Sequence, residues 1–401
     1  MAAQYIVYLI LVTICCVQKS LEWMTERCDD LIVETREMFV DILNPFAKMK
    51  LIDALQRLGV SYHFKEEIDN SLESLVSVKF ANDDFHAISL QFRLLRQQRR
   101  YMPCDAFKEF IDKQGNLNGT LCSDTRALLA LYEAAHLGTP NEEILREAQV
   151  ETTNQLKRIV DCIEKPLSNK VRHALETPSF RRMKRLEARL YIPLYEEDKE
   201  ECNEMILELA KLDFYLLQRL HREEVKEICE WDEKGAEQLG RCYKEYAQFM
   251  FGTMNEIEEG VTEEVMIWMS GFPQIVKDSC IVSRLMDDIV AHAFETERNN
   301  VATAVTCYMK EYDSTKEEAI KALWNDVENA WKDMNEEYLK LTSIPSSLLI
   351  QVINLARMME TMYKKIDGYT DSAILKEWIS LLLSVSIMNN RVSKLASDDP
   401  M

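Results

Sequence analysis

Apolar residues recur at intervals of three and four positions along most of the chain, which is the spacing of helices that bury one face. Runs of alternating apolar and polar residues between hairpin turns, the pattern of strands, do not stand out. The pattern therefore predicts helix after helix and an all-α fold. Its clearest segments are 51–58, 90–96, 128–132, 206–210 and 348–358.

Glycine and proline mark the expected breaks between these helices. Thr177-Pro178-Ser179 interrupts the helical pattern, and the basic run 181–185 follows it in an otherwise acidic chain. This change favours a domain junction there. The other breaks fall at 115–119, at 138–140, near Pro166 and at 271–273.

Residues 5–17 form a continuous apolar run, YIVYLILVTICCV. The run is shorter than the about 20 residues that span a bilayer comfortably. It has the length of the hydrophobic part of a signal peptide, but residues 1–4 carry no basic side chain. Three interpretations stay open: a secretory or membrane-tethering signal, a mis-assigned first exon, and a buried helix.

Composition narrows the class of protein. The 401 residues include only 10 glycines and 9 prolines, as expected for long helices with few tight turns. The phosphate-binding motifs GxGxxG and GxxxxGK[ST] are absent. The net charge of −20 repels nucleic acid, so we expect no nucleic-acid partner.

The 11 cysteines form no CxxC pair and are odd in number, which favours a reduced, intracellular protein. The sequence predicts no Cys/His pair, no nucleophile elbow and no HExxH metal motif. We therefore expect a cytoplasmic protein. The endoplasmic reticulum or the secretory pathway is the alternative if residues 5–17 act as a signal.

The segment 284–298, RLMDDIVAHAFETER, holds the most informative polar pattern. At 3.6 residues per turn, Asp287 and Glu295 lie within about 80° of each other, and Arg284 and Arg298 fall inside the same arc. Two carboxylates and two guanidinium groups on one helix face suit a hard divalent cation together with a phosphate-bearing ligand. His292 lies about 140° from Asp287, away from this face.

The alternative for this face is a solvated surface with ion pairs between neighbouring turns. In a chain with 68 acidic residues, carboxylate clusters also arise by chance. We interpret the others as solvated faces or helix starts, since none has the Asp-Asp-x-x-Asp spacing. They lie at 29–34, 82–84, 196–200 and 256–259.

The segment 284–298 resembles the second metal-binding motif of plant class I terpene synthases, [N/D]-D-x-x-[S/T]-x-x-x-E. The resemblance covers the chain from about residue 22 to its end and is closest in character to the sesquiterpene-forming branch. It implies an α-barrel-like domain at 21–180 after the segment 1–20, and a metal-binding α-bundle at 181–401. Co-linear matches lie at 51–63, 85–97, 128–136, 186–192, 209–214 and 367–370.

The resemblance also implies a reaction, in which a prenyl diphosphate is ionised and the carbocation folds in an apolar pocket. Farnesyl diphosphate is the implied substrate, and Mg²⁺ is the implied metal, with Mn²⁺ as its alternative. The family's pattern places metal binding on Asp287, Asp288 and Glu295, diphosphate binding on Arg284 and Arg298, and the lining of the hydrocarbon pocket on Tyr369.

Two departures from the family's pattern stand out. Ala291 occupies the Ser/Thr position of the motif. The Asp-Asp-x-x-Asp helix of the family is absent, because the chain passes directly from Trp231 to Asp232 where that segment belongs. Near 258–264 the chain again passes directly between two segments that are separated in the family. Skipped exons would produce two such joins. We expect the shortened bundle to bind Mg²⁺–diphosphate weakly and to cyclise poorly.

Two functions of different class therefore stand. The first is a Mg²⁺-dependent class I terpene synthase that makes a sesquiterpene. The second is a truncated, non-catalytic helical family member, such as a pseudogene product or an interaction protein. Membrane contact is expected only if residues 5–17 act as an anchor.

Overall fold

In a computed structural model, the regular secondary structure is helical, and one isolated bridge joins Ile111 and Leu117. The predicted all-α fold is confirmed. For residues 2–20, 227–235, 263 and 293–297 the structure describes the backbone only. The described residues are 2–111, 117–235, 262–297, 302–364, 367–368, 373 and 375–388.

Contacts within the chain define two compact units, each assembled from separate stretches of sequence. The change from unit 2 to unit 1 at residue 184 lies close to the junction predicted at Pro178. The linear division into domains 21–180 and 181–401 stays a prediction. Unit 1 comprises 1–75, 184–229 and 378–401, and unit 2 comprises 76–183 and 230–377.

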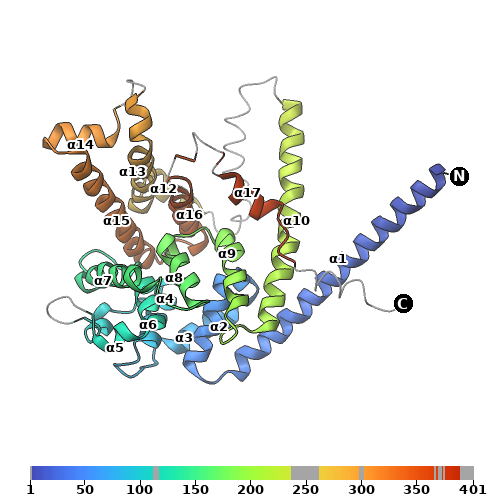
Figure 1. Cartoon of the computed structure of the whole chain (residues 1–401), viewed down its shortest axis with the longest axis horizontal. Coiled ribbons are helices and arrows are strands. Elements are labelled where there is room, and N and C mark those ends of the chain that lie inside the picture. The colour runs from blue at the N-terminus through green and yellow to red at the C-terminus, as the bar shows by residue number, and fades with distance from the viewer. Residues whose placement is uncertain are drawn as a thin grey trace. The chain divides into compact units, whose positions relative to one another are not determined.

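Unit 1 is built around two long helices, α1 and α10 (Figure 1). The Arg27 guanidinium in α1 donates to both carboxylate oxygens of Glu208 in α10, at 3.0 and 2.8 Å. The helices of unit 1 are α1 (Ala2–Asp41), α2 (Pro45–Arg57), η1 (Ser61–Phe64), α3 (Lys65–Leu75), α9 (Lys184–Glu197), most of α10 (Glu204–Gly235) and, from residue 378, α17 (Leu375–Leu383).

A glycine allows α2 and α9 to approach closely in unit 1. Gly59, which follows α2, has a φ of +82°, and a Cβ added there would lie 2.7 Å from the Cβ of Ala188. Any other residue would be strained in this conformation and would also clash. No helix in the described part of the chain combines the length and hydropathy needed to cross a bilayer.

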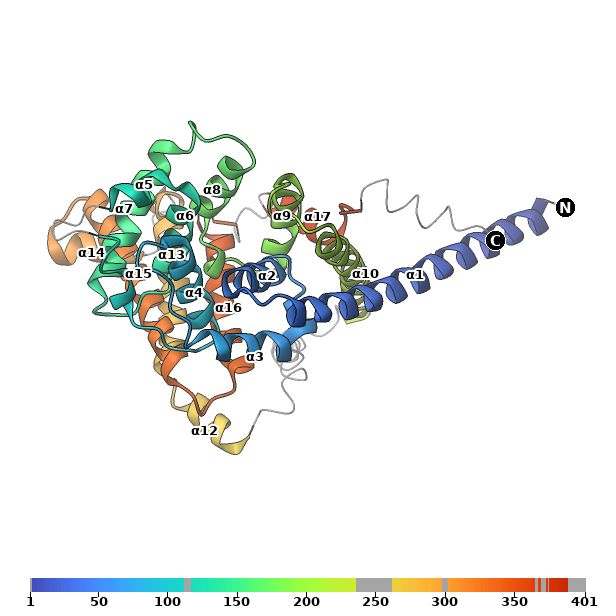
Figure 2. The ribbon, with the colours of Figure 1, turned by 90° about the horizontal axis from the view of Figure 1, so that it is seen from below.

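One continuous core of buried apolar side chains runs through unit 2. Figure 2 shows α6 between α4 and α7, which both pack against it, and α13 packs against α15 and α16. The helices of unit 2 are α4 (Phe85–Gln97), η2 (Cys104–Phe107), α5 (Gly119–Ser123), α6 (Thr125–Ala135), α7 (Glu143–Ile159), α8 (Leu167–Glu176), η3 (Ser179–Arg181), α12 (Glu263–Ser270), α13 (Gln274–Glu297), α14 (Ala304–Tyr312), α15 (Lys316–Lys340) and α16 (Ser346–Met362).

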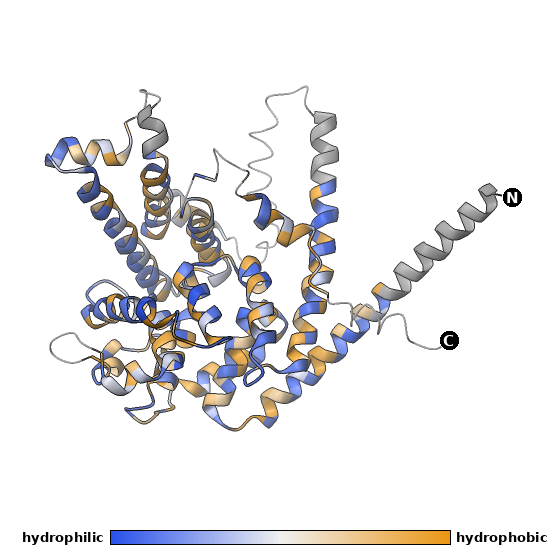
Figure 3. Ribbon diagram, viewed as in Figure 1, coloured by the Kyte–Doolittle hydropathy of each residue, from blue (hydrophilic) through white to orange (hydrophobic). Residues whose placement is uncertain are grey.

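The five apolar segments predicted as helices all lie within helices: α2, with Leu58 as its C-cap, then α4, α6, α10 and α16. Hydrophilic and hydrophobic residues alternate along α10 and α15, the pattern of helices that bury one face (Figure 3). The predicted breaks are also found. Pro166 precedes α8, Pro178 separates α8 from η3, and 271–273 separates α12 from α13.

A buried arginine joins η3 to two C-terminal helices of unit 2. Both terminal nitrogens of Arg181 bond to Glu328 of α15, at 2.5 and 2.7 Å, and Nη1 lies 3.7 Å from Glu360 of α16. The guanidinium also lies over the ring of Trp331, whose indole N–H donates to Glu360 at 3.1 Å. Burial alone would raise the pKa of Glu328, but the Arg181 guanidinium holds it well below its usual range.

Removal of this cation should be strongly destabilising. We expect Arg181→Ala to lower the free energy of unfolding by about 3 kcal/mol, because it removes the guanidinium from the half-buried Glu328 and from the buried Glu360, which retains Lys364 at 3.3 Å. Urea denaturation at neutral pH measures the loss. The matched control is Arg146→Ala, since the Arg146–Glu143 pair is exposed and should cost less than about 1 kcal/mol. Equal losses for the two variants would contradict the prediction.

Candidate functional site

The predicted metal-binding segment lies on α13, a helix held firmly in unit 2. A turn precedes the helix, in which Phe272 has a φ of 50° and Pro273 stands next to the first helical residue. One face of α13 buries Val282 and Met286 in the core. The Ser279 hydroxyl donates to the carbonyl of Val352 in α16 at 3.0 Å, which fixes the rotation of α13 against its neighbour.

Two acids and one arginine of the predicted site meet on the described part of α13. Nη2 of Arg284 lies 2.7 Å from Oδ1 of Asp288, and Nη1 lies 3.9 Å from Oδ2 of Asp287. The Arg284 side chain is 60% exposed and that of Asp287 is 35% exposed, whereas Asp288 is 4% exposed. Asp287 and Arg284 are thus accessible to a ligand from solvent.

Asp288 differs from Asp287 because it supports the start of the next helix. Its Oδ2 accepts the backbone N–H of Ala304 at 2.8 Å, at the first residue of α14. Its Oδ1 is bonded to Arg284. Both oxygens are therefore occupied by cationic or N–H donors, so a metal at Asp288 would have to replace at least one of them.

The position that carries a hydroxyl in the family motif is apolar and closed here. Ala291 is 4% exposed. Its neighbour His292 is buried as well, and its Nδ1 lies 3.0 Å from the Thr303 hydroxyl. This contact confirms that His292 belongs to the packing around α14 and not to the face of Asp287.

Three of the predicted site residues fall outside the description of their side chains. Glu295 lies on the helical backbone of α13 without a described side chain. Arg298 and Tyr369 lie outside the described residues, as does the acidic cluster 256–259. Their predicted roles stay predictions.

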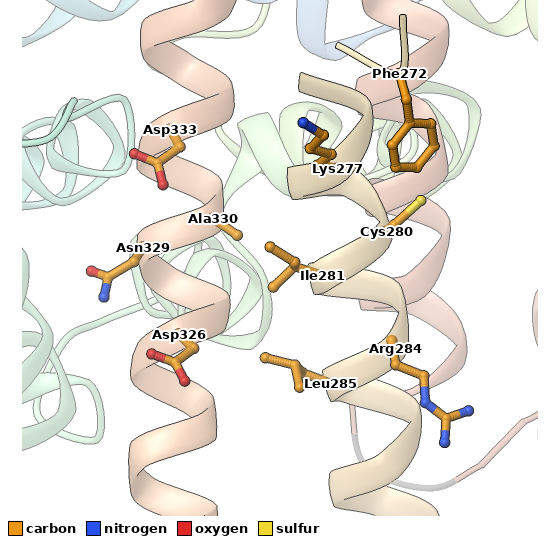
Figure 4. Close-up of a pocket in the computed structure, with 10 residues that line it drawn as sticks. All are labelled: Phe272, Lys277, Cys280, Ile281, Arg284, Leu285, Asp326, Asn329, Ala330 and Asp333. Carbon is orange, nitrogen blue, oxygen red and sulfur yellow. The ribbon is translucent and has the colours of Figure 1, made fainter. Parts of the chain in front are cut away.

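A groove of about 640 Å³ runs between α13 and α15 beside this face. Ile281 and Leu285 project from α13 toward α15, whereas Arg284 points away from α15 (Figure 4). The α15 side carries the carboxylates of Asp326 and Asp333. The α13 side of the groove thus combines apolar side chains with the cations Lys277 and Arg284, and the α15 side is acidic; Arg284 borders both the groove and the face of Asp287.

Sequence reasoning missed two polar features of the structure. The carboxyl of Asp278 on α13 is buried, and its Oδ2 has no hydrogen-bond partner. In unit 1, Cys28, His63 and Asp213 lie together, a grouping that the sequence did not reveal. These residues are far apart in the sequence, His63 and Asp213 by 150 positions, and no local pattern connects them.

Comparison with known proteins identifies the class to which this fold and helix belong. Family models match residues 9–175 as "Terpene synthase, N-terminal domain" and residues 258–333 as "Terpene synthase family, metal binding domain". The chain is 31% identical to (-)-germacrene D synthase of Vitis vinifera, with 90% of each protein covered. It is 30% identical to (+)-delta-cadinene synthase isozyme XC1 of Gossypium arboreum, over 88% of this chain and 90% of that protein.

The chain belongs to the terpene synthase family, whose enzymes are lyases. Its fold matches the crystal structure of isoprene synthase from grey poplar leaves with a TM-score of 0.80 and 22% identity, over 92% of this chain and 98% of that one. The alignment with germacrene D synthase runs over 503 residues, more than the 401 of this chain. The relative therefore contains internal residues without a counterpart in this chain.

Asp278 should make stability depend on pH. Burial raises its pKa from 3.8 to about 6, opposed by the hydrogen bond from Gln274 and increased by the Asp333 and Glu337 carboxylates. An acid with a raised folded pKa binds more protons when folded, so its ionisation destabilises the protein as pH rises from about 4 to about 6. Above about pH 6 the full free-energy cost of the buried, ionised Asp278 carboxylate is present.

We expect Asp278→Asn to be more stable than the unsubstituted protein at pH 7.5 by about 1 kcal/mol, because a neutral amide replaces a buried charge. At pH 4 the two should differ little. Urea denaturation at both pH values measures this, with the exposed Asp326→Asn as the control. A gain that is the same at both pH values would show that the charge of Asp278 is not its cause.

Proposed function

We propose that this protein is a Mg²⁺-dependent class I terpene synthase that ionises farnesyl diphosphate and forms a sesquiterpene. The single observation that carries the proposal is the accessible pair of Asp287 and Arg284 on α13. A half-exposed carboxylate beside an exposed guanidinium supplies one ligand for Mg²⁺ and one cation for a diphosphate. The relatives support the choice of substrate, because one of them, 30% identical to this chain, is named sesquiterpene synthase 2.

The metal and the arginines act together in this proposal. Mg²⁺ is bound by few carboxylates, keeps several waters and prefers substrate phosphates as further ligands. The grey poplar isoprene synthase was crystallised with three Mg²⁺ ions and dimethylallyl-S-thiolodiphosphate, a diphosphate analogue. We assign metal binding to Asp287 and Glu295, with Asp288 as a supporting acid. Arg284 and Arg298 would bind the diphosphate. Tyr369 would line the hydrocarbon pocket.

The departures of the site lower the activity that we expect. Ala291 offers no hydroxyl to the metal, and both oxygens of Asp288 are held by Arg284 and Ala304. The predicted loss of the Asp-Asp-x-x-Asp helix would remove the opposing carboxylates. Fewer ligands and a weaker field around the leaving diphosphate both raise the barrier to ionisation. These same observations favour the second candidate function, a non-catalytic family member.

Activity should be weak, strictly dependent on Mg²⁺ and sensitive to Asp287. The full chain is incubated with farnesyl, geranyl or geranylgeranyl diphosphate, with or without Mg²⁺, and gas chromatography of the products measures turnover. We expect Asp287→Asn to lower turnover of farnesyl diphosphate about 100-fold, because it removes a charge that stabilises the leaving group. Glu311→Gln, a change at an exposed acid on α14, should have no effect.

Binding separates the two candidate functions when turnover is too low to measure. Calorimetry with inorganic diphosphate and Mg²⁺ should show binding that Asp287→Asn weakens. If the protein forms no product and shows no Mg²⁺-dependent binding of diphosphate, the terpene synthase proposal fails and the non-catalytic function replaces it. Sequencing of the transcript across 231–232 and 258–261 tests the two joins, since a message with the aspartate-rich segment would encode a complete site.

We propose a cytoplasmic location, as expected from the cysteine pattern. Residues 5–17 are the segment that decides between this location and the secretory pathway. A fluorescent protein fused behind residues 1–20 should stay in the cytosol of plant cells, because the run lacks a basic flank. Signal in the endoplasmic reticulum would overturn the proposal and favour the alternative.

A further inference from the structure

Three side chains with different metal-binding atoms meet in unit 1, far from α13 in sequence. Cys28 comes from α1, His63 from η1 and Asp213 from α10. The Cys28 sulfur, an imidazole nitrogen of His63 and a carboxylate oxygen of Asp213 all lie within 4.8 Å of one another. Within the described residues, no other group of three His, Cys, Asp or Glu side chains converges in this way.

The contacts of Asp213 bring the cluster together. Nε2 of His63 lies 2.9 Å from its Oδ1, and the Tyr62 hydroxyl donates to the same oxygen. Both hydrogen bonds use Oδ1, which leaves Oδ2 as the second donor oxygen of the carboxylate. The rings of Tyr62 and His63 lie 4.0 Å apart between centroids and form one edge of the cluster.

One side of the cluster is closed to solvent, and the other side is partly exposed. Cys28 is 5% exposed and Asp213 is 4% exposed. The His63 side chain is 21% exposed, and Tyr62 as a residue is 55% exposed. The side of the cluster that faces solvent is therefore the one formed by the two rings.

The elements that carry these side chains are fixed around the cluster. Arg27 of α1 bonds to Glu208, five residues before Asp213 on α10. Nη2 of Arg36 donates to the His63 carbonyl at 3.1 Å, and its Nε bonds to Glu67 at 2.9 Å. These contacts hold η1 against α1, so the ligand atoms converge without a further change of the backbone.

We propose that Cys28, His63 and Asp213 bind a Zn²⁺ ion, with water as the fourth ligand. One sulfur, one nitrogen and one oxygen donor match the preference of Zn²⁺ for mixed N, S and O ligands in a tetrahedron. Bond lengths of about 2.0–2.3 Å separate neighbouring ligand atoms by about 3.3–3.8 Å. A change of about 1 Å in side-chain position therefore closes the cluster around the ion. The thiolate excludes Mg²⁺, which prefers oxygen ligands.

The charges around the cluster give the site a defined dependence on pH. Burial raises the pKa of the Cys28 thiol to about 12, and the carboxylates of Asp213 and Asp29 add to the rise. The Arg185 guanidinium is the nearby cation that acts on Asp213 and Tyr62. Zn²⁺ binds cysteine as the thiolate, so binding at Cys28 releases the thiol proton and becomes stronger as pH rises.

The test measures Zn²⁺ bound per full chain by competition with a chromophoric chelator, and Co²⁺ as a spectroscopic probe. We expect one tight Zn²⁺ per chain in excess Mg²⁺, and a near-ultraviolet thiolate-to-Co²⁺ absorption band. Cys28→Ser should abolish the band. Cys28→Ser and Asp213→Asn should each weaken Zn²⁺ binding at least about 100-fold, since loss of an outer-shell partner alone costs 10- to 100-fold.

The matched control is Cys202→Ser, which removes a half-buried thiol of the same unit that lies outside the cluster. It should leave both the band and the stoichiometry unchanged. Circular dichroism establishes that each variant is folded, and His63→Gln gives a third ligand change if one of the others unfolds.

Two results would overturn the zinc site. One is Zn²⁺ binding that is equal in the unsubstituted protein and in folded Cys28→Ser and Asp213→Asn, which would place the metal on other cysteines. The other is the absence of tight Zn²⁺ at pH 8, which would leave a hydrogen-bonded Tyr62–Asp213–His63 cluster beside a buried thiol. Asp287→Asn should not affect Zn²⁺, so this test and that of the α13 site fail independently.

Discussion

Buried polar side chains that bond to distant backbone carbonyls are the constraint on which the packing of unit 2 depends. Nδ2 of Asn335 on α15 donates to the carbonyls of His136 and Gly138, at 3.1 and 3.0 Å. Nε of Arg357 on α16 donates to the Phe180 carbonyl at 2.6 Å. The accepted carbonyls lie just after α6 and within η3, and an unpaired buried donor would cost about 1–3 kcal/mol. Since α13 packs on α15 and α16, these bonds also position the candidate site.

The helices themselves follow from local sequence, and the contacts between them do not. Apolar spacing predicts α6 and α16 because each residue's face is set by its position along one helix. The bond from Asn335 to the His136 carbonyl joins residues 199 positions apart, and that from Arg357 to the Phe180 carbonyl joins residues 177 apart. The sequence alone does not show whether an arginine is buried or exposed. Arg181 therefore appears there only as part of the basic run 181–185.

The candidate site shows the same division between local and distant information. Spacing predicts that Asp287 and Arg284 share a face of α13, and the structure places them within 3.9 Å. The family resemblance adds Asp288 as a supporting acid, and nothing in the motif shows where α14 begins. Adjacent helical residues differ by 100° in direction, and this turns Asp288 toward the N-terminus of α14. Asp287 therefore remains accessible from solvent, whereas Asp288 supports the start of α14.

The two proposed metal sites differ in how far they depend on the part of the chain where the family's aspartate-rich helix is expected. The proposed class I site would take carboxylates from two facing helices, so the predicted loss of one helix would leave only the half on α13. The zinc cluster draws on α1, η1 and α10, and its last ligand, Asp213, precedes the join at Trp231. Hard oxygen ligands on α13 and a sulfur–nitrogen–oxygen set in unit 1 also select different ions. A chain that has lost catalytic metal binding would for these reasons still retain the donors of the zinc site.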